Sequence, residues 1–149
     1  NGRIIEAVKI FNKESKKNKV KLIITLEGNS DENIIYTGRI PFPEIFGVYP
    51  RVDALVFPSL TETLGLPLIE AEYFHIPRIV SNRPYAYEIC QEYAYYFDPM
   101  NIESMVDAIK EFVKDKELGI CKINSSKIEL NSSYMDYIKL ILSDREGKQ

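Results

Sequence analysis

Residues 54–80 contain the segment that most restricts how this chain can fold: a buried strand, a polar loop and a helix in direct succession. Residues 54–57 form a short apolar run that Pro58 stops, which is typical of a strand buried on both faces. A polar loop begins at Ser59 and ends at Gly65. Leu66 and Pro67 then predict a helix, because proline fits the first helical turn, where its missing N–H group is no loss.

Apolar runs and amphipathic segments alternate along the rest of the chain. The apolar runs predict strands at residues 20–26, 33–37, 54–57, 78–81 and 95–97. The amphipathic segments predict helices at 3–18, 66–74, 86–91 and 102–116, the last with Asn101 as its N-cap, a short helix at 43–49, and two tail helices between about 120 and 143. This alternation is typical of an α/β protein. We therefore expect a doubly wound parallel sheet in one domain of residues 1–149, with its core in residues 3–116.

The charge and the cysteines limit the class of protein. The chain has a net charge of −3 at pH 7 and a pI near 5.3, which argues against a nucleic-acid binder, since such proteins need clustered basic surface. No apolar run reaches the length of a membrane span, and the first residues do not resemble a signal peptide. Cys90 and Cys121 show no metal-ligand spacing, so we interpret them as reduced thiols in a cytoplasmic protein.

Two carboxylates flank the predicted helix start at Gly65. Glu62 lies in the loop and Glu70 lies one turn into the helix, with seven residues between them. A helix N-terminus presents free N–H groups and a positive dipole end, which favours an anion such as a phosphate. A carboxylate can accept hydrogen bonds from both hydroxyls of a diol. One acid could therefore hold a ribose and the other a hexose, on either side of a phosphate.

The same residues carry a resemblance to a known family. Pro58-Ser59, Glu62, Gly65-Leu66-Pro67 and Glu70-Ala71 resemble the glutamate–seven residues–glutamate signature of the retaining, nucleotide-sugar-dependent glycosyltransferases of the GT-B fold, in the large group 1 or family 4 set. Further matches are Gly38-Arg39, Val52-Asp53, residues 76–80, Glu88 and residues 96–99, and the similarity covers about residues 3–143. His75 departs from the pattern, because the family usually has glycine there, and this difference bears on packing.

The resemblance implies a fold and an activity. The fold is a Rossmann-like parallel sheet flanked by helices, the C-terminal half of a GT-B enzyme, apparently without its first, central strand and the following loop of basic residues that clasp the donor diphosphate. Without that strand, strands 20–26 and 54–57 are expected to flank a gap or to close on each other. The activity is transfer of a hexose from a nucleotide diphosphate sugar to a glycan or lipid acceptor, without a metal or other cofactor. An N-terminal domain outside this chain would bind the acceptor, so the chain alone is expected to be inactive.

The resemblance also implies roles for single residues. Glu62 is the implied catalytic residue, acting on sugar hydroxyls near the reacting carbon, and Glu70 is implied to bind the ribose. The implied nucleotide-sugar-binding residues are Gly38, Arg39, Ser59, Thr63, Leu64, Gly65, Leu66 and Glu70.

Several alternatives stay open. A non-catalytic nucleotide-binding or assembly module could keep this half-fold without turnover. Gly38 and Arg39 also fit a turn with a surface arginine, and His75 is interpreted as structural. Glu88 could belong to the site, but a favourable interaction with the N-terminal end of the predicted helix, or packing, explains it equally well. The tyrosines at 85, 87, 93, 95 and 96 fit a sugar-stacking platform or, more commonly, a tyrosine-rich core. Peripheral association of the full-length protein with the inner face of a membrane is an alternative to a purely cytoplasmic location.

Overall fold

The computed structural model describes residues 2–125 and has the predicted alternation of strands and helices. The strands are β1 (Leu22–Ile24), β2 (Ile34–Tyr36), β3 (Leu55–Phe57), β4 (Arg78–Ser81) and β5 (Tyr95–Phe97). The helices are α1 (Gly2–Glu14), α2 (Leu66–Tyr73), α3 (Pro84–Cys90) and α4 (Ile102–Leu118). The short helix predicted at 43–49 is found as two 3-10 helices, η1 (Glu44–Gly47) and η2 (Tyr49–Arg51).

The described strands pair in parallel, as the alternation predicts, but they form two sheets rather than one. β1 pairs with β2, and β3, β4 and β5 pair in that order. All four residues of β4 are buried, as expected for a central strand covered on both faces. The residues of β3, by contrast, are only half-buried, and Ile23 in the middle of β1 is exposed. β1 and β3 are therefore edge strands within the described part of the chain.

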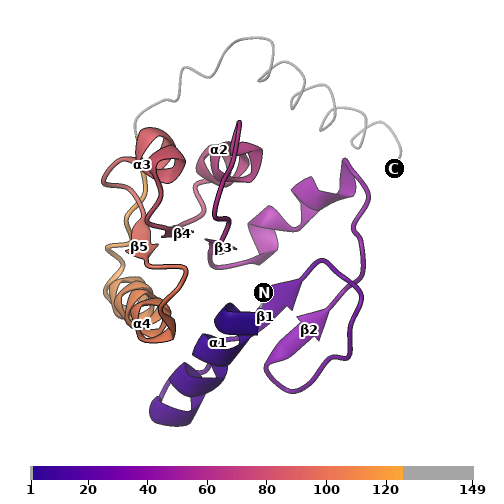
Figure 1. Ribbon diagram of the computed structural model, residues 1–149, viewed down its shortest axis with the longest axis vertical. Coiled ribbons are helices and arrows are strands. Elements are labelled where there is room, and N and C mark those ends of the chain that lie inside the picture. Colours follow the sequence, from indigo (N-terminus) through magenta and orange to yellow (C-terminus); the bar gives the residue numbers. More distant parts are fainter. Residues whose placement is uncertain (1, 126–149) are drawn as a thin grey trace.

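Helices cover both faces of the three-stranded sheet (Figure 1). α2 and α3 pack on one face, whereas α4 packs on the other face and also against α1. The pleat of β4 separates two cores, because Ile79 joins the cluster of α1 and α4 while Val80 joins the cluster under α2 and α3. Ile24 and Ile34 also belong to the first cluster, so α1 and α4 tie the two sheets together.

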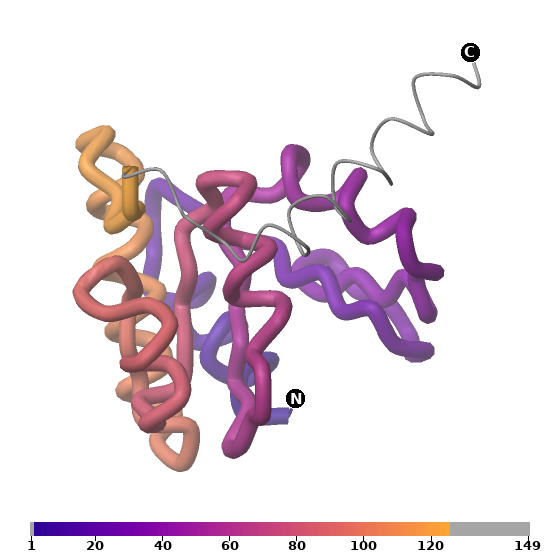
Figure 2. The backbone as a smooth tube through the Cα atoms, turned by 90° about the horizontal axis from the view of Figure 1, so that it is seen from above, coloured from indigo at the N-terminus to yellow at the C-terminus, as the bar shows by residue number. Residues whose placement is uncertain are grey.

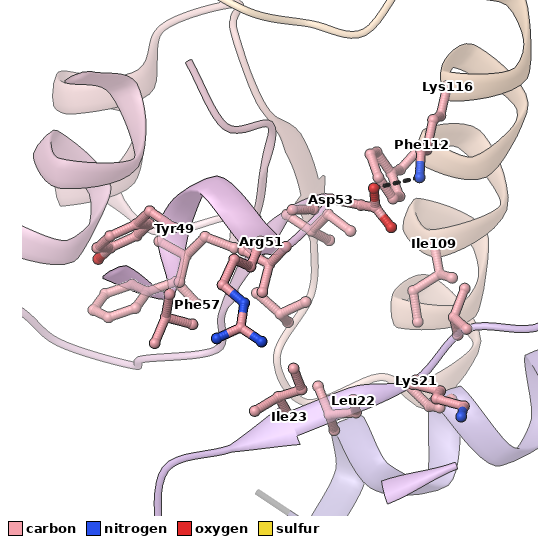
Figure 3. Close-up of a pocket in the computed structure, with 18 of the residues that line it drawn as sticks. Lys21, Leu22, Ile23, Tyr49, Arg51, Asp53, Phe57, Ile109, Phe112 and Lys116 are labelled. Carbon is pink, nitrogen blue, oxygen red and sulfur yellow. Dashed lines mark ion pairs between the residues drawn. The ribbon is translucent and has the colours of Figure 1, made fainter. Parts of the chain in front are cut away.

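A cavity of about 990 Å³ lies between the two sheets (Figure 3). Its lining includes Leu22 and Ile23 of β1, all of β3, and Ile109 and Phe112 of α4. In Figure 2 the violet and purple segments from β1 to η2 lie to the right and the orange helix α4 lies to the left. The strands predicted at 20–26 and 54–57 thus flank a gap, which is one of the two arrangements expected from the resemblance.

Two predicted boundaries near the N-terminus are wrong. α1 ends at Glu14 rather than at residue 18, because two side chains near its end bind the backbone of the turn that follows. The amide of Asn12, in the last turn of α1, bridges the N–H and C=O of Val20, and Ser15 Oγ accepts from the N–H of Asn18. β1 spans three residues rather than the predicted seven, because it has a partner along one edge only among the described residues.

The predicted tail helix is also wrong for residues 120–125. Gly119 adopts a left-handed φ of 69°, and the N–H of Ile120 bonds back to the C=O of Asp115, which ends α4 in a glycine cap. The chain then runs back along the protein, where the N–H of Lys122 donates to the Tyr95 hydroxyl at 3.1 Å. The remainder of the two helices predicted up to residue 143 lies outside the described residues.

Candidate functional site

The β3–α2 connection forms as the sequence predicts, around the conformation of Gly65. This residue is the N-cap of α2, with a left-handed φ of 57°, and its C=O accepts from the N–H of Leu68 at 2.9 Å. A Cβ atom at position 65 would lie 2.5 Å from Cδ1 of Ile89 on α3. Both the dihedral angle and the close approach of α3 therefore require glycine here. Pro67 follows in the first turn of α2, where the sequence places it.

The loop before α2 is bonded to α3 at its first residue, Ser59, and its following residues are exposed. The Tyr85 hydroxyl donates to the C=O of Ser59 at 2.7 Å, and burial raises the pKa of Tyr85. Ser59 Oγ donates to the C=O of Thr61 at 2.8 Å. Glu62 is exposed, and its carboxylate accepts from the N–H of Thr63 at 3.3 Å. The predicted binding residues Thr63, Leu64 and Leu66 are exposed as well. This loop thus presents a carboxylate and a helix N-terminus to solvent.

Glu70 lies in a different environment from Glu62. Its side chain is on the inner side of α2, only 7% of the residue surface is exposed, and Oε2 accepts from the Tyr49 hydroxyl at 2.7 Å. The Tyr49 ring stacks on Phe74 at a centroid distance of 5.3 Å, which fixes the position of the hydroxyl. Glu70, Tyr49 and Pro67 line the cavity between the sheets, whereas Glu62 is not among the described residues that line it.

The remaining predicted site residues lie on the other sheet. Gly38 follows the C-terminal end of β2, is buried with a φ of 69°, and donates its N–H to the C=O of Leu26 at 3.0 Å. Arg39 next to it is exposed. The structure therefore brings Ser59, Thr63, Leu64, Gly65 and Leu66 together with Glu62 on one loop, while Glu70 faces the cavity and Gly38 and Arg39 belong to the neighbouring sheet.

A buried ion pair fixes α2 to the sheet. Arg78 on β4 is 2% exposed, and its guanidinium donates to Glu72 Oε2 at 2.8 Å, to the C=O of Leu68 at 3.2 Å and to the C=O of Tyr93 at 3.3 Å. Glu72 Oε1 accepts from the Asn124 amide at 2.9 Å. Because Leu68 and Glu72 both belong to α2, this network sets the position of the helix whose N-terminus forms the candidate site.

Four of the five tyrosines, at 85, 87, 95 and 96, make different contacts. Tyr95 is fully buried in the core, and its hydroxyl donates to Asp115 at 3.0 Å, in agreement with the core alternative. Tyr85 holds the loop at Ser59. Tyr87 is exposed and stacks on Tyr96 at 4.2 Å.

Sequence reasoning missed three contributors: Tyr49, Tyr85 and Arg78. The hydrogen bond between Tyr49 and Glu70 joins residues 21 positions apart in the sequence, and no regular spacing indicates it. The one usable signal is Arg78, a charged residue at the start of a run that is otherwise apolar, which indicates a buried partner. Cys90 and Cys121 are free thiols, and His75 is exposed at the end of α2.

Within residues 2–125, no group of three or more histidine, cysteine or acidic side chains lies close enough together to hold a metal ion. No helix in the same range is both long and apolar enough to cross a membrane.

Comparison with known proteins gives one family and several relatives. The family model described as "Glycosyl transferases group 1" matches residues 3–122. The O-antigen chain mannosyltransferase RfbU of Salmonella typhimurium is 31% identical over 102 residues, which cover 62% of this chain and 28% of the relative. The serotype-specific mannosyltransferase WbdA of Escherichia coli is 39% identical over 66 residues, which cover 44% of this chain and 8% of the relative. The chain thus spans less than a third of the length of these relatives.

Proposed function

Because the chain belongs to the group 1 glycosyltransferases, we propose that it forms the donor-binding half of a retaining enzyme that transfers a mannosyl residue from a nucleoside diphosphate sugar to a glycan or lipid acceptor. Mannose is proposed because both matched relatives are named mannosyltransferases. Polypeptide outside this chain would bind the acceptor and supply the second half of the active site, since the matched residues cover only 28% of the mannosyltransferase RfbU.

The observation that carries the proposal is the β3–loop–α2 unit. Gly65 starts α2 without a side-chain cap, so the N–H of Leu66 and the positive end of the helix dipole lie at an exposed loop, where the diphosphate would be held. Glu62 is exposed three residues before that helix start, so it can reach the sugar attached to the diphosphate. Its negative charge would stabilise an oxocarbenium-like transition state, in which positive charge develops at the reacting carbon.

Glu70 would bind the ribose hydroxyls, and Tyr49 would position its carboxylate. A ribose has to share the carboxylate with the Tyr49 hydroxyl or displace it, because Oε2 already accepts from that hydroxyl. We therefore expect Glu70→Gln to weaken donor binding by about 1.5–3 kcal/mol, the usual contribution of a hydrogen bond to a charged group. This corresponds to a dissociation constant that is about 10- to 150-fold higher.

The decisive experiment measures transfer of labelled mannose by the enzyme that contains this chain. We expect Glu62→Gln to lower kcat by about 10²- to 10³-fold, in the range found when one electrostatic contact to a transition state is removed. Glu70→Gln should mainly raise the donor KM, and Glu6→Gln on the exposed side of α1 is the matched control. Full activity of the Glu62→Gln enzyme, with unchanged melting, would refute the catalytic assignment.

The 149-residue chain alone should bind the donor weakly and show no transfer. A helix N-terminus contributes about 0.3–1 kcal/mol at an exposed site and up to about 2 kcal/mol when partly buried. Micromolar binding requires about 8 kcal/mol, so the α2 terminus falls well short, and Glu62 and Glu70 add repulsion toward a diphosphate. Calorimetry with nucleoside diphosphate mannose tests this, and micromolar affinity for the isolated chain would contradict it.

A further inference from the structure

We propose that Tyr85 on α3 is the positioning residue of Glu62, because its hydroxyl holds the start of the loop that carries this carboxylate. The inference rests on the proposed function, in which Glu62 acts on the sugar of the donor. It goes beyond that function by assigning a role in turnover to a side chain of the neighbouring helix, which acts through the loop rather than on the donor.

α3 contacts both ends of the loop that carries Glu62. At the first end, the Tyr85 hydroxyl donates to the C=O of Ser59 at 2.7 Å. At the last end, Cδ1 of Ile89 lies 2.5 Å from the place where a Cβ atom of residue 65 would be. Tyr85 and Ile89 are four residues apart, so they share one face of α3. One face of one helix therefore holds Ser59 and Gly65 at a fixed separation.

Between these two ends the loop has only local hydrogen bonds. Residues 60–64 are exposed, and Glu62 lies at their centre. Its carboxylate accepts from the N–H of the next residue at 3.3 Å, which ties the side chain to the loop itself. Within residues 2–125, the Tyr85 hydroxyl makes the one hydrogen bond between residues 59–64 and another element. The position of Glu62 relative to the rest of the site therefore depends on Tyr85.

Tyr85 extends from a helix that is firmly packed. Its ring meets Phe57 at the end of β3 edge-on, with 6.3 Å between the ring centroids. Ala86 and Cys90 of α3 are buried with Val80 of β4 in the core under α2 and α3. Figure 1 shows α3 beside α2 on this face of the sheet. Groups built on packed elements are placed more precisely than groups on loops, so α3 is a suitable support for an exposed loop.

The hydroxyl of Tyr85 is the part of this side chain that the packing does not need. A phenylalanine ring at position 85 would fill the same space against Phe57. Burial raises the pKa of Tyr85, and the negative charge of Glu62 raises it further, so the hydroxyl stays protonated and remains a donor. The contribution of the hydroxyl is therefore its bond to the C=O of Ser59.

An ordered loop matters more for turnover than for donor binding. In the proposed function the start of α2 holds the diphosphate and Glu70 holds the ribose, and both belong to α2. Glu62, by contrast, has to be in place when positive charge develops at the reacting carbon. Without the Tyr85 bond the loop would leave that position in a share of the molecules. Fewer complexes would then react, although the donor would still bind.

Tyr85→Phe in the enzyme that contains this chain removes the hydroxyl and keeps the ring. We expect kcat for transfer of labelled mannose to fall about 3- to 10-fold, the change that one neutral hydrogen bond makes in an equilibrium. The donor KM should stay within about twofold of the parent value. Tyr96→Phe is the matched control, because the Tyr96 hydroxyl also donates to a backbone C=O, that of Gln91, but bonds the end of α3 rather than the loop. Its kcat should equal that of the parent.

Two further measurements separate positioning from general damage. In the Glu62→Gln enzyme, Tyr85→Phe should lower kcat by less than about twofold, because the loop then carries no carboxylate to position. In the 149-residue chain, NMR relaxation reports on the loop without any need for activity. The order parameters of the Thr61 and Thr63 amides should fall toward the flexible range below about 0.6 in Tyr85→Phe. They should keep the parent values in Tyr96→Phe.

Three results would overturn the inference. An unchanged kcat, or a raised donor KM as the main effect, would show that Tyr85 does not act through the placement of Glu62. An equal loss of kcat in the Glu62→Gln enzyme would show that Tyr85 acts independently of that carboxylate. Unchanged order of the loop amides would overturn the inference even in an active enzyme.

Failure of the proposed function would give a different pattern. A parent enzyme that transfers no mannose would refute that function, and with it the role of Tyr85 in turnover. The loop amides of Tyr85→Phe would still show whether Tyr85 holds Glu62 in place.

Discussion

Replacing Arg78 should test whether the buried ion pair holds α2 in place. Arg78→Met removes three hydrogen bonds, to Glu72, to the C=O of Leu68 and to the C=O of Tyr93, and fills the space with an unbranched apolar side chain. Glu72 then remains a carboxylate that is 8% exposed and has lost its cationic partner. Breaking a buried pair from one side in this way costs about 3–5 kcal/mol, because a charge stays buried without compensation.

The double variant separates this penalty from the lost packing. In Glu72→Leu/Arg78→Met no buried charge is left, and the remaining loss is that of the Arg78 hydrogen bonds to the C=O groups of Leu68 and Tyr93 and of the Asn124 hydrogen bond to Glu72, about 1–3 kcal/mol each at most. The two single substitutions should therefore sum to several kcal/mol more than the double substitution, which is the signature of residues in direct contact. Since small domains have a total stability of about 5–15 kcal/mol, the single Arg78→Met change should remove a large share of it.

The assay is urea unfolding of the chain, followed by far-ultraviolet circular dichroism because the sequence has no tryptophan. The free energy of unfolding is extrapolated for each variant, with the slope checked for constancy. Lys17→Met, which breaks the exposed pair with Glu117, is the control and should leave the urea midpoint close to that of the parent. A loss below about 1 kcal/mol for Arg78→Met, or a double variant whose cost equals the sum of the singles, would refute the reasoning.

Three further predictions concern single positions. His75→Gly should stabilise the chain by about 1 kcal/mol, because His75 has a left-handed φ of 55° at the end of α2, and an unchanged urea midpoint would contradict this. Gly65→Ala should destabilise it by about 1–2 kcal/mol, and Ile89→Val in the same chain should recover part of the loss by removing the atom 2.5 Å from the new methyl group. Burial raises the pKa of the Cys90 thiol to about 11, so at pH 8 a thiol reagent should label the half-buried Cys121 first, and equal rates would contradict the buried position of Cys90.

Local sequence signals predicted most of the fold. β4 and β5 have the predicted boundaries, and Asn101 caps α4 as expected by accepting from the N–H of Ser104. These elements depend on short-range chemistry: an apolar run of the right length, or a side-chain oxygen three residues before a free N–H group. The start of α2 after Gly65 was predictable for the same reason, since glycine before Leu-Pro indicates a helix start.

What sequence reasoning missed depends on contacts between distant residues. The hydrogen bond between Tyr49 and Glu70 joins a 3-10 helix to α2, and no periodicity relates the two positions. The end of α1 was misplaced because the Asn12 side chain binds Val20 across a turn, a contact that competes with the helical pattern of the lysine-rich segment. The gap that divides the strands into two sheets was expected from the resemblance alone, because no residue of β1 or β3 indicates it.

The His75 position links the family pattern to the physics of the chain. The N–H groups of His75 and Ile76 bond back to the C=O groups of Glu72 and Ala71 at 2.9 and 2.8 Å, and Pro77 follows, which is the arrangement of a helix that ends in a left-handed residue. Glycine adopts that conformation without steric cost, so backbone geometry rather than chemistry would explain the glycine that the resemblance implies at this position. The two glutamates differ from His75, because the backbone conformation of α2 does not explain either of them. Glu62 is exposed on a loop, and Glu70 is buried against Tyr49. A ligand, as proposed above, would explain the exposed Glu62, whereas Glu70 is also held in the fold by its hydrogen bond to Tyr49.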